Sequence, residues 1–239
     1  MGMSSLARFV LILCLAALPA GAQTPAPPAG DNMLRIPGFP PIPLPPGARA
    51  FPDTGPAPAE TAPPAASKAE APKAREPFNA PRALTELFER LGKTADPDEA
   101  RGIATQIQRI WTRTTSDTAE VLMARALTAM EQRNFDVSLE VLDKVVVLEP
   151  GWAEGWNRRA TVRWLADDLT GSVADIAQVL ALEPRHFGAL SGLAGILERS
   201  GFDKRALETW RRLKEIYPAT PDIDKHIEKL TLDVEGREI

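Results

Sequence analysis

The sequence predicts an all-α protein in which pairs of helices repeat and stack into a solenoid. Three prolines recur at one constant interval along the chain, at Pro150, Pro184 and Pro218. Small residues and large apolar residues recur at the same interval, as in Ala126, Ala160 and Ala194, in Leu122, Trp156 and Leu190, and in Ser138, Ser172 and Ala206. We call the step from Pro150 to Pro184 the repeat interval. A period shared by so many positions is typical of a stacked repeat rather than of one globular core.

The N-terminal residues have the three parts of a secretory signal peptide. Arg8 supplies the positive charge, residues 9–18 form a short apolar run, and Ala-Gly-Ala at 20–22 matches a cleavage site. The run is too short to cross a hydrocarbon core about 30 Å thick. We therefore expect residues 1–22 to be a signal peptide, and the mature protein to be periplasmic or secreted in a bacterium, with no stable membrane span after cleavage.

Residues 23–80 form a Pro/Ala-rich segment, and 17 of the 23 prolines lie between Pro25 and Pro81. The segment has too few large apolar residues to offset the entropy lost on ordering, so we expect a disordered linker. Within it, residues 33–46 are unusually apolar. Two interpretations stay open for this run: a docking motif for an aromatic-lined groove, or only a spacer.

Helical signals begin near residue 82. One apolar stripe, spaced for a helix over 82–91, consists of Leu84, Leu87, Phe88 and Leu91. Asp96 and Pro97 then predict the start of a second helix, because an N-cap carboxylate is followed by a proline at the first helical position. We expect the buried face of that helix to carry Ile103, Ile107, Ile110 and Trp111. Ala104 lies one repeat interval before Ser138, so we interpret residues 82–115 as a degenerate, shortened first repeat.

Three regular units follow, at about 119–152, 153–186 and 187–220. In each, two helices are joined by a short turn, and the second helix ends near one of the three prolines, which disfavour helical conformation in the preceding residue. A last helix is predicted over 221–234, with apolar residues beside a charged face. That pattern is typical of the polar cap that a solenoid needs at its end.

The second unit carries the residues of a known family. Its Trp156, Ala160, Ser172 and Pro184 stand at positions that make the unit resemble a tetratricopeptide repeat (TPR). A repeat of that family is a helix–turn–helix of about 34 residues, which matches the repeat interval. The resemblance covers residues 119–218 as three units and extends more weakly back to residue 82. It implies a right-handed helix–turn–helix solenoid whose first helices line a concave binding surface.

Arginine replaces the leucine that the family usually has at one buried position, in Arg125 and Arg159, whereas the third unit keeps Leu193. One interpretation is an arginine pair that faces a groove and takes a ligand carboxylate. The other is an ion pair within the repeat, such as Arg159 with Asp175 on the facing helix. We favour the ion pair, because an inward arginine needs a partner to be tolerated.

No catalytic pattern is present in the sequence. The chain has one cysteine, Cys14, and its two histidines, His186 and His226, are not spaced as metal ligands. It has no glycine-rich phosphate loop. We therefore expect no enzyme, with no catalytic, metal or cofactor-binding residues and no cofactor. The net charge of −4, without a basic block, gives no electrostatic footprint for nucleic acid.

The resemblance to TPR proteins also implies a set of partner-binding positions on the first helices. Carried over one by one, the candidates are Met123, Asn157, Arg158, Thr161, Trp164, Glu198 and Arg199. The second unit is the richest of the three, because tryptophan and arginine are the residues most often central to interfaces. Whether Trp164 faces the groove or packs on the next unit stays open.

The leading hypothesis is a non-catalytic periplasmic adaptor that binds a peptide or protein partner on the concave face and takes part in an envelope complex for cell-envelope assembly or maturation. The signal peptide, the proline-rich segment and the repeat motivate it. Two alternatives stay open: a self-associating structural protein, and an accessory module of a cell-wall enzyme.

Overall fold

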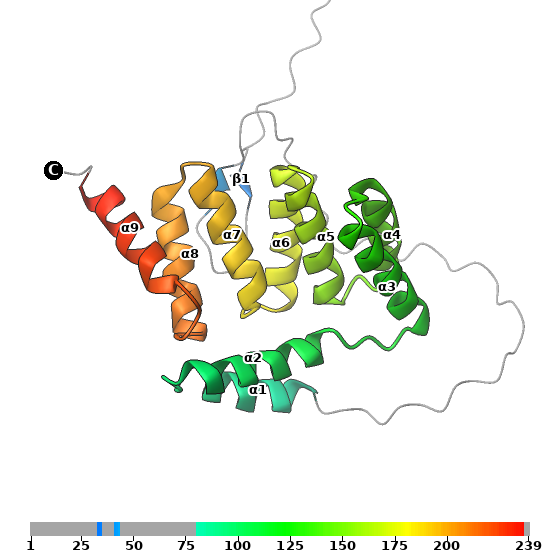
Figure 1. Cartoon of the computed structure of the whole chain (residues 1–239), viewed down its shortest axis with the longest axis horizontal. Coiled ribbons are helices and arrows are strands. Elements are labelled where there is room, and N and C mark those ends of the chain that lie inside the picture. The colour runs from blue at the N-terminus through cyan, green and yellow to red at the C-terminus, as the bar shows by residue number, and fades with distance from the viewer. Residues whose placement is uncertain (1–32, 35–40, 44–79, 237–239) are drawn as a thin grey trace, which may run out of the picture. The chain divides into compact units, whose positions relative to one another are not determined.

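The computed structural model describes residues 33–34, 41–43 and 80–236. The expected signal peptide lies outside these residues, as does most of the expected linker. No helix among the described residues is long and apolar enough to cross a membrane. The described elements (Figure 1) are β1 Met33–Leu34, β2 Ile42–Pro43, α1 Ala80–Leu91, α2 Pro97–Trp111, α3 Asp117–Glu131, α4 Phe135–Leu148, α5 Ala153–Leu165, α6 Leu169–Leu182, α7 Phe187–Arg199, α8 Asp203–Ile216 and α9 Ile223–Glu235.

Three helix pairs, α3–α4, α5–α6 and α7–α8, repeat one arrangement, and α9 follows them (Figure 1). The all-α solenoid expected from the repeat interval is confirmed. The backbone conformation repeats as well. The turn within each pair has one residue in the left-handed conformation, and these residues are one repeat interval apart: Arg133 (φ 58°), Asp167 (φ 64°) and Gly201 (φ 75°). The residue after it caps the second helix in the first two pairs, where Asn134 and Asp168 accept backbone N–H bonds. Phe202 replaces the cap in the third pair and makes no such bond.

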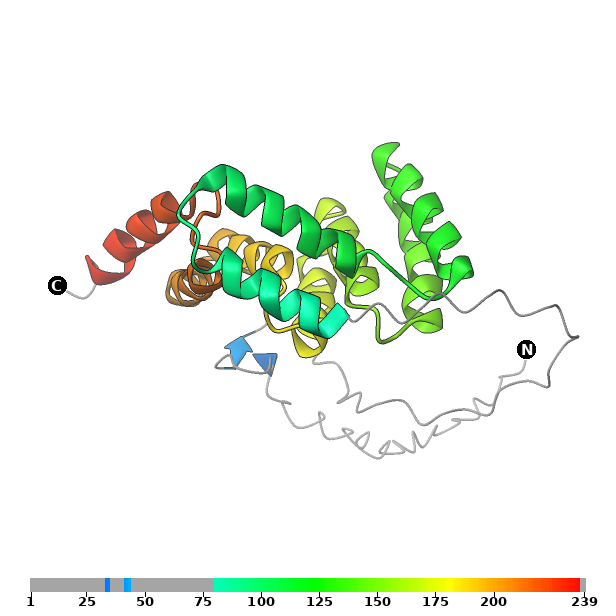
Figure 2. The ribbon, with the colours of Figure 1, turned by 90° about the horizontal axis from the view of Figure 1, so that it is seen from below.

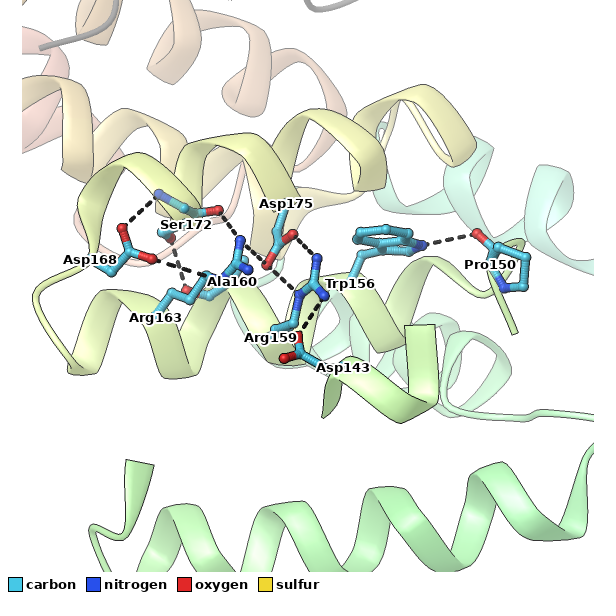
Figure 3. Close-up of polar contacts among 10 residues, drawn as sticks. Asp143, Pro150, Trp156, Arg159, Ala160, Arg163, Asp168, Ser172 and Asp175 are labelled. Carbon is cyan, nitrogen blue, oxygen red and sulfur yellow. Dashed lines mark hydrogen bonds and ion pairs between the residues drawn. The ribbon is translucent and has the colours of Figure 1, made fainter. Parts of the chain in front are cut away.

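Small residues bring the two helices of each pair together. Ser138 donates its hydroxyl hydrogen to the carbonyl oxygen of Ala126 at 2.9 Å. Ser172 does the same to Ala160 at 2.8 Å (Figure 3). In the third pair Ala206 stands at this position and is fully buried. The recurrence of small residues in the sequence is therefore a recurrence of close helix–helix contact, and the serine hydroxyls are satisfied within it.

The first helix pair, α1–α2, does not sit where the repeat interval places it. As a degenerate first repeat it is expected to begin the stack in front of α3. Figures 1 and 2 instead show α1 and α2 running across the ends of the later helices. The ring of Trp111 stacks on His186 with centroids 4.1 Å apart, and the Trp152 indole N–H donates to the Trp111 carbonyl oxygen at 2.7 Å. The guanidinium of Arg185 lies 4.2 Å from the ring centroid of Phe88.

The loops that hold α1–α2 are those next to the repeated prolines, which lead from one unit to the following one. The apolar stripe expected for the pair is buried there, with Phe88, Leu91, Ile103, Ile107 and Trp111 in the same core as the second and third units. The side of α3 that an earlier unit would cover is not equally apolar. Val162 of α5 inserts into the preceding pair, but its counterpart one repeat interval earlier is Thr128, which is exposed. The α1–α2 pair, a helical hairpin, therefore buries its apolar stripe against the later units, where apolar surface is available.

The segment expected to be disordered contains a described pair of strands. β1 and β2 are antiparallel, with Met33 opposite Pro43 and Leu34 opposite Ile42. The sequence between them includes Pro37-Gly38, a turn-forming dipeptide. The remainder of the apolar run over 33–46, residues 35–40 and 44–46, lies outside the described residues, so both interpretations of this run, docking motif or spacer, stay open.

Candidate functional site

A hollow of about 370 Å³ lies between the first helices of the second and third units. Helix α5 contributes Asn157, Thr161 and Trp164, and Ile176 of α6 lies beneath. Helix α7 contributes the opposite wall, made of Gly188, Ser191, Gly192, Gly195 and Arg199. We call this hollow the α5–α7 groove. It lies on the surface that the resemblance to TPR proteins implies for binding.

The α5 wall follows from helical spacing. Asn157, Thr161 and Trp164 stand at i, i+4 and i+7, so they share one face. The hydroxyl of Thr161 donates to the Asn157 carbonyl oxygen at 2.9 Å, and the Asn157 amide nitrogen donates to Glu154 at 3.0 Å. Trp164 is 47% exposed, although burial of an indole is strongly favourable. The wall therefore presents a large apolar ring whose position is set by an ordered helix.

The α7 wall is rich in glycine, with Gly188, Gly192 and Gly195 among its lining residues. The side chains of Ala189, Ser191, Ile196 and Arg199 complete it. A Cβ added at Gly192 would come 3.5 Å from the Ile176 Cδ1 atom, and one added at Gly195 would meet nothing within 4 Å. Glycine inside a helix costs about 1 kcal/mol relative to alanine. The helix carries this cost at positions facing the groove, and the result is a surface to which another backbone can approach closely.

Few charges face the α5–α7 groove. Arg199 is the one ionised side chain among its lining residues, and its guanidinium pairs with Asp167 at 2.7 Å on the exposed rim. Such exposed ion pairs contribute at most about 1 kcal/mol to the stability of the fold. The groove therefore favours an uncharged ligand, because a buried ligand charge would find no unpaired partner in it.

At the N-terminal end of α7 the groove adjoins a second hollow of about 350 Å³. Gly188 and Ser191 line both hollows. Residues of α2 bound the second one, including Arg101, Thr105 and Gln108. Sequence reasoning assigned α2 to a first repeat far from this place, so it could not identify these residues as part of the surface.

Four of the seven candidate residues come together in the groove: Asn157, Thr161, Trp164 and Arg199. Of the two placements left open for Trp164, the structure has the one that lines the groove. Glycines 188 and 192 were not among the candidates, although their helical spacing on one face was a usable signal.

Met123, Arg158 and Glu198 lie elsewhere. Met123 is buried in the core of the first unit. Arg158 forms an ion pair with Glu154 one turn earlier on α5. Glu198 turns toward α9, where it accepts a hydrogen bond from Lys229 at 2.8 Å. Burial alone would raise the pKa of Glu198, but Lys229 and the neighbouring donors hold this pKa below its ordinary value.

The expected ion pair of Arg159 with Asp175 is confirmed (Figure 3). The guanidinium donates twice, from Nε to Oδ2 at 2.9 Å and from Nη2 to Oδ1 at 2.7 Å, and it also reaches Asp143 at 2.8 Å. Arg163 adds a second cation, 3.2 Å from Asp175. Burial by itself would lower the pKa of Arg159, but the carboxylates raise it, so the guanidinium stays charged. Arg159 thus joins the helices of the second unit and does not face a ligand.

The groove offers binding surfaces rather than reactive groups. Among residues 80–236 and the described strand residues, no three His, Cys, Asp or Glu side chains gather as they would around a metal ion. The uncharged polar groups that line the α5–α7 groove are one side-chain amide and several hydroxyls. Of these, the Thr161 hydroxyl already donates a hydrogen bond to its own helix. Such a site can hold and orient a peptide.

Known proteins similar to this chain were found by sequence and by structure. No family model matches the chain. A TPR repeat-containing protein of Rhizobium etli is 40% identical over 153 residues, which cover 64% of this chain and 75% of the relative. Among solved structures, the first TPR of Spaghetti (RPAP3) bound to an HSP90 peptide is 16% identical, with a TM-score of 0.48 over 52% of this chain and 98% of that one. The crystal structure of MamA is 17% identical, with a TM-score of 0.47 over 66% of this chain and 85% of that one. On the identity to the Rhizobium etli protein and the share of it that is matched, the chain belongs to the family of TPR repeat-containing proteins.

Proposed function

We propose that this chain is a non-catalytic scaffold that binds a peptide, or an extended segment of a protein partner, in the α5–α7 groove. The observation that carries the proposal is the half-exposed ring of Trp164, which shares one hollow with the glycines of α7. Aromatic side chains held at the wall of a pocket are the usual anchors of an interface.

The size of the groove suits a short peptide. The α7 wall runs from Gly188 to Arg199, which is about 16 Å at ~1.5 Å per helical residue. An extended peptide of about five residues, at ~3.3 Å each, has the same length. The second hollow beside α2 would lengthen the contact at one end.

The charges favour an apolar or uncharged ligand. The one guanidinium in the groove is already paired with Asp167, so a ligand carboxylate would have to compete with that partner. The TPR mode that clamps a C-terminal carboxylate needs a Lys/Asn pattern that the groove residues do not have. An uncharged segment can cover the indole at a small cost in desolvation free energy.

A displayed peptide library panned against the full chain tests the proposal. Peptides recovered from it should bind with a Kd that Trp164→Ala weakens by about 30-fold or more, since anchors of this kind contribute about 2 kcal/mol. Leu165→Ala is the matched control, because Leu165 is the next residue, is exposed and does not line the groove. Equal loss in both variants, or no loss in either, would contradict a groove site.

The second part of the proposal is export, with a role in cell-envelope assembly or maturation. It rests on the pattern of residues 1–22. In a bacterial host the chain should appear in the periplasmic fraction with Gln23 at its N-terminus. A photo-crosslinking residue at Trp164 should then capture an envelope protein. An unprocessed chain confined to the cytosol would refute this part and leave peptide binding untouched.

A further inference from the structure

We propose that copies of this chain associate end to end, with α9 of one copy packed on the exposed side of α3 of the next. The inference goes beyond the proposed function and uses no residue of the α5–α7 groove. Figure 1 shows α3 and α9 at opposite ends of the row of units, so one copy can offer each end to a different neighbour. Such a contact is heterologous, because the two surfaces that meet are different.

The side of α3 that an earlier unit would cover carries an apolar residue beside a cation. Val121 is 68% exposed, and Arg125 lies one turn later on the same face and is also exposed. Among the described residues, the Arg125 side chain has no hydrogen bond or ion pair. This end of the row therefore presents uncovered apolar surface next to an unpaired positive charge.

The second unit shows which partner Arg125 lacks. Arg159 lies one repeat interval later, and it pairs with Asp175 of its own unit and with Asp143 of the unit before. The counterpart of Asp143 one repeat interval earlier is Arg109 of α2. In front of α3, Arg109 would face Arg125 with the same charge and repel it. A helix that covers this end of the row therefore has to bring a carboxylate.

The outward side of α9 has the matching residues. Glu228 and Leu232 lie one turn apart on this side, and Leu232 is 75% exposed. In the part of the chain that the structure describes, the Glu228 carboxylate has no partner. The charged residues around it on α9 do have partners, in the ion pairs Asp224–Lys214, Lys225–Asp222 and Lys229–Glu198.

The two sides fit when the helices run antiparallel. On α3 the apolar Val121 precedes the charged Arg125 by one turn, whereas on α9 the charged Glu228 precedes the apolar Leu232 by one turn. Antiparallel helices therefore bring both pairs together at once, apolar on apolar and carboxylate beside guanidinium. Burial of the aliphatic side chains provides attraction, and the opposite charges select this alignment. The net charge of −4 opposes association little, because repulsion between distant surface charges is screened over about 8 Å at physiological ionic strength.

Charge reversal tests the contact by sedimentation of the full chain. The parent should sediment faster as its concentration rises. Arg125→Glu and Glu228→Arg should each stay monomeric, with the melting temperature of the parent, because substitutions at exposed positions change stability little. Arg211→Glu, at an exposed position on α8, is the matched control and should associate as the parent does. A parent that stays monomeric, or equal loss in the control, would overturn the inference.

Mixing the two variants distinguishes an end-to-end contact from a symmetric one. In an equimolar mixture, the intact Arg125 of the Glu228→Arg chain can meet the intact Glu228 of the Arg125→Glu chain. The mixture should therefore associate, although each variant alone does not. A mixture as monomeric as its components would contradict the pairing of these two residues.

Cysteine pairs provide a measurement that does not depend on charge. In a Cys14→Ser background, Val121→Cys with Leu232→Cys should give disulfide-linked ladders longer than a dimer on oxidation with copper phenanthroline. Val147→Cys with Leu232→Cys is the control, because Val147 is 81% exposed on α4 and takes no part in the contact. Equal ladders from both pairs would contradict the inference. Efficient dimers from Val121→Cys or Leu232→Cys alone would assign a symmetric dimer and overturn it.

Discussion

Trp111 stacks on His186 with ring centroids 4.1 Å apart and planes inclined by 13°. His186 in turn accepts the backbone N–H of Ala189 at its Nδ1 atom, which caps α7. The α1–α2 hairpin is thus joined to the beginning of the helix that supplies the glycine wall of the groove. Trp111 and His186 are far apart in the sequence, and their contact holds α2 beside the hollow that adjoins the α5–α7 groove.

Trp111→Ala should release the hairpin from this place. The substitution removes a buried aromatic ring, and such changes cost about 3–5 kcal/mol. Urea denaturation should show the loss, and protease should cut residues 80–115 faster than in the parent. Gln106→Ala, at an exposed position on the same helix, should stay within about 0.5 kcal/mol of the parent. A small loss for Trp111→Ala would mean that the hairpin is not held by this contact.

Asp175→Ala should destabilise the second unit strongly. It leaves the largely buried guanidinium of Arg159 without its bidentate partner, and breaking a buried pair from one side costs about 3–5 kcal/mol. The double variant Arg159→Met with Asp175→Leu should recover much of the loss, because it removes both charges. Denaturation curves of the single and double variants check the expectation. A double variant as unstable as the single one would contradict it.

Glu154 should contribute a pH dependence to stability. Burial alone would raise its pKa, but His186, Arg158 and Asn157 hold the pKa of the folded state below the ordinary value of 4.5. The unfolded chain then binds the proton more tightly, so this contribution is present above about pH 4.5 and is lost as pH falls through the folded pKa. The free energy of unfolding should fall less steeply below pH 4.5 in Glu154→Gln than in the parent. Parallel curves would show that Glu154 is not the group responsible.

Position 172 should tolerate alanine and reject leucine. Ser172→Ala loses one hydrogen bond to Ala160, worth about 0.5–1.5 kcal/mol, and the third unit already has alanine here at Ala206. Ser172→Leu forces extra volume between two closely packed helices and should cost more, about 1–3 kcal/mol beyond the alanine variant. Thermal melts of the two variants measure the difference. If leucine were as well tolerated as alanine, close approach of the helices would not explain the small residue at this position of each unit.

The position of the first helix pair shows where reading the sequence was insufficient. Its helices and their apolar stripe were predictable from the spacing of Leu84 to Leu91 and from the Asp96 cap. Ala104 also fitted the register of the repeat. Yet Thr128 on α3 puts a polar residue where the later units have an apolar one, and the stripe is buried on the loops near His186 instead. A periodic pattern tells which face of a helix is apolar, but not which distant surface covers it.

The candidate site also contains residues that the sequence could place and residues that it could not. Asn157, Thr161 and Trp164 could be placed on one helical face from their spacing, and the Arg159–Asp175 pair from the need of an inward charge for a partner. Met123 could not be told from a surface residue in this manner, because its burial depends on the helices of the first unit that close over it. Glu198 likewise turned to α9, a helix that the family pattern does not place.

The sequence by itself determined the helices of each unit and the turns between them, because these depend on residues close together in the chain. They recur at a constant interval because equivalent residues make the same helix–helix contacts in each unit. The groove and the hairpin that bounds it are not local. They arise where surfaces of α2, α5 and α7 meet. That meeting depends on the shapes and apolar areas of elements distant in the sequence, which only their packing in three dimensions brings together.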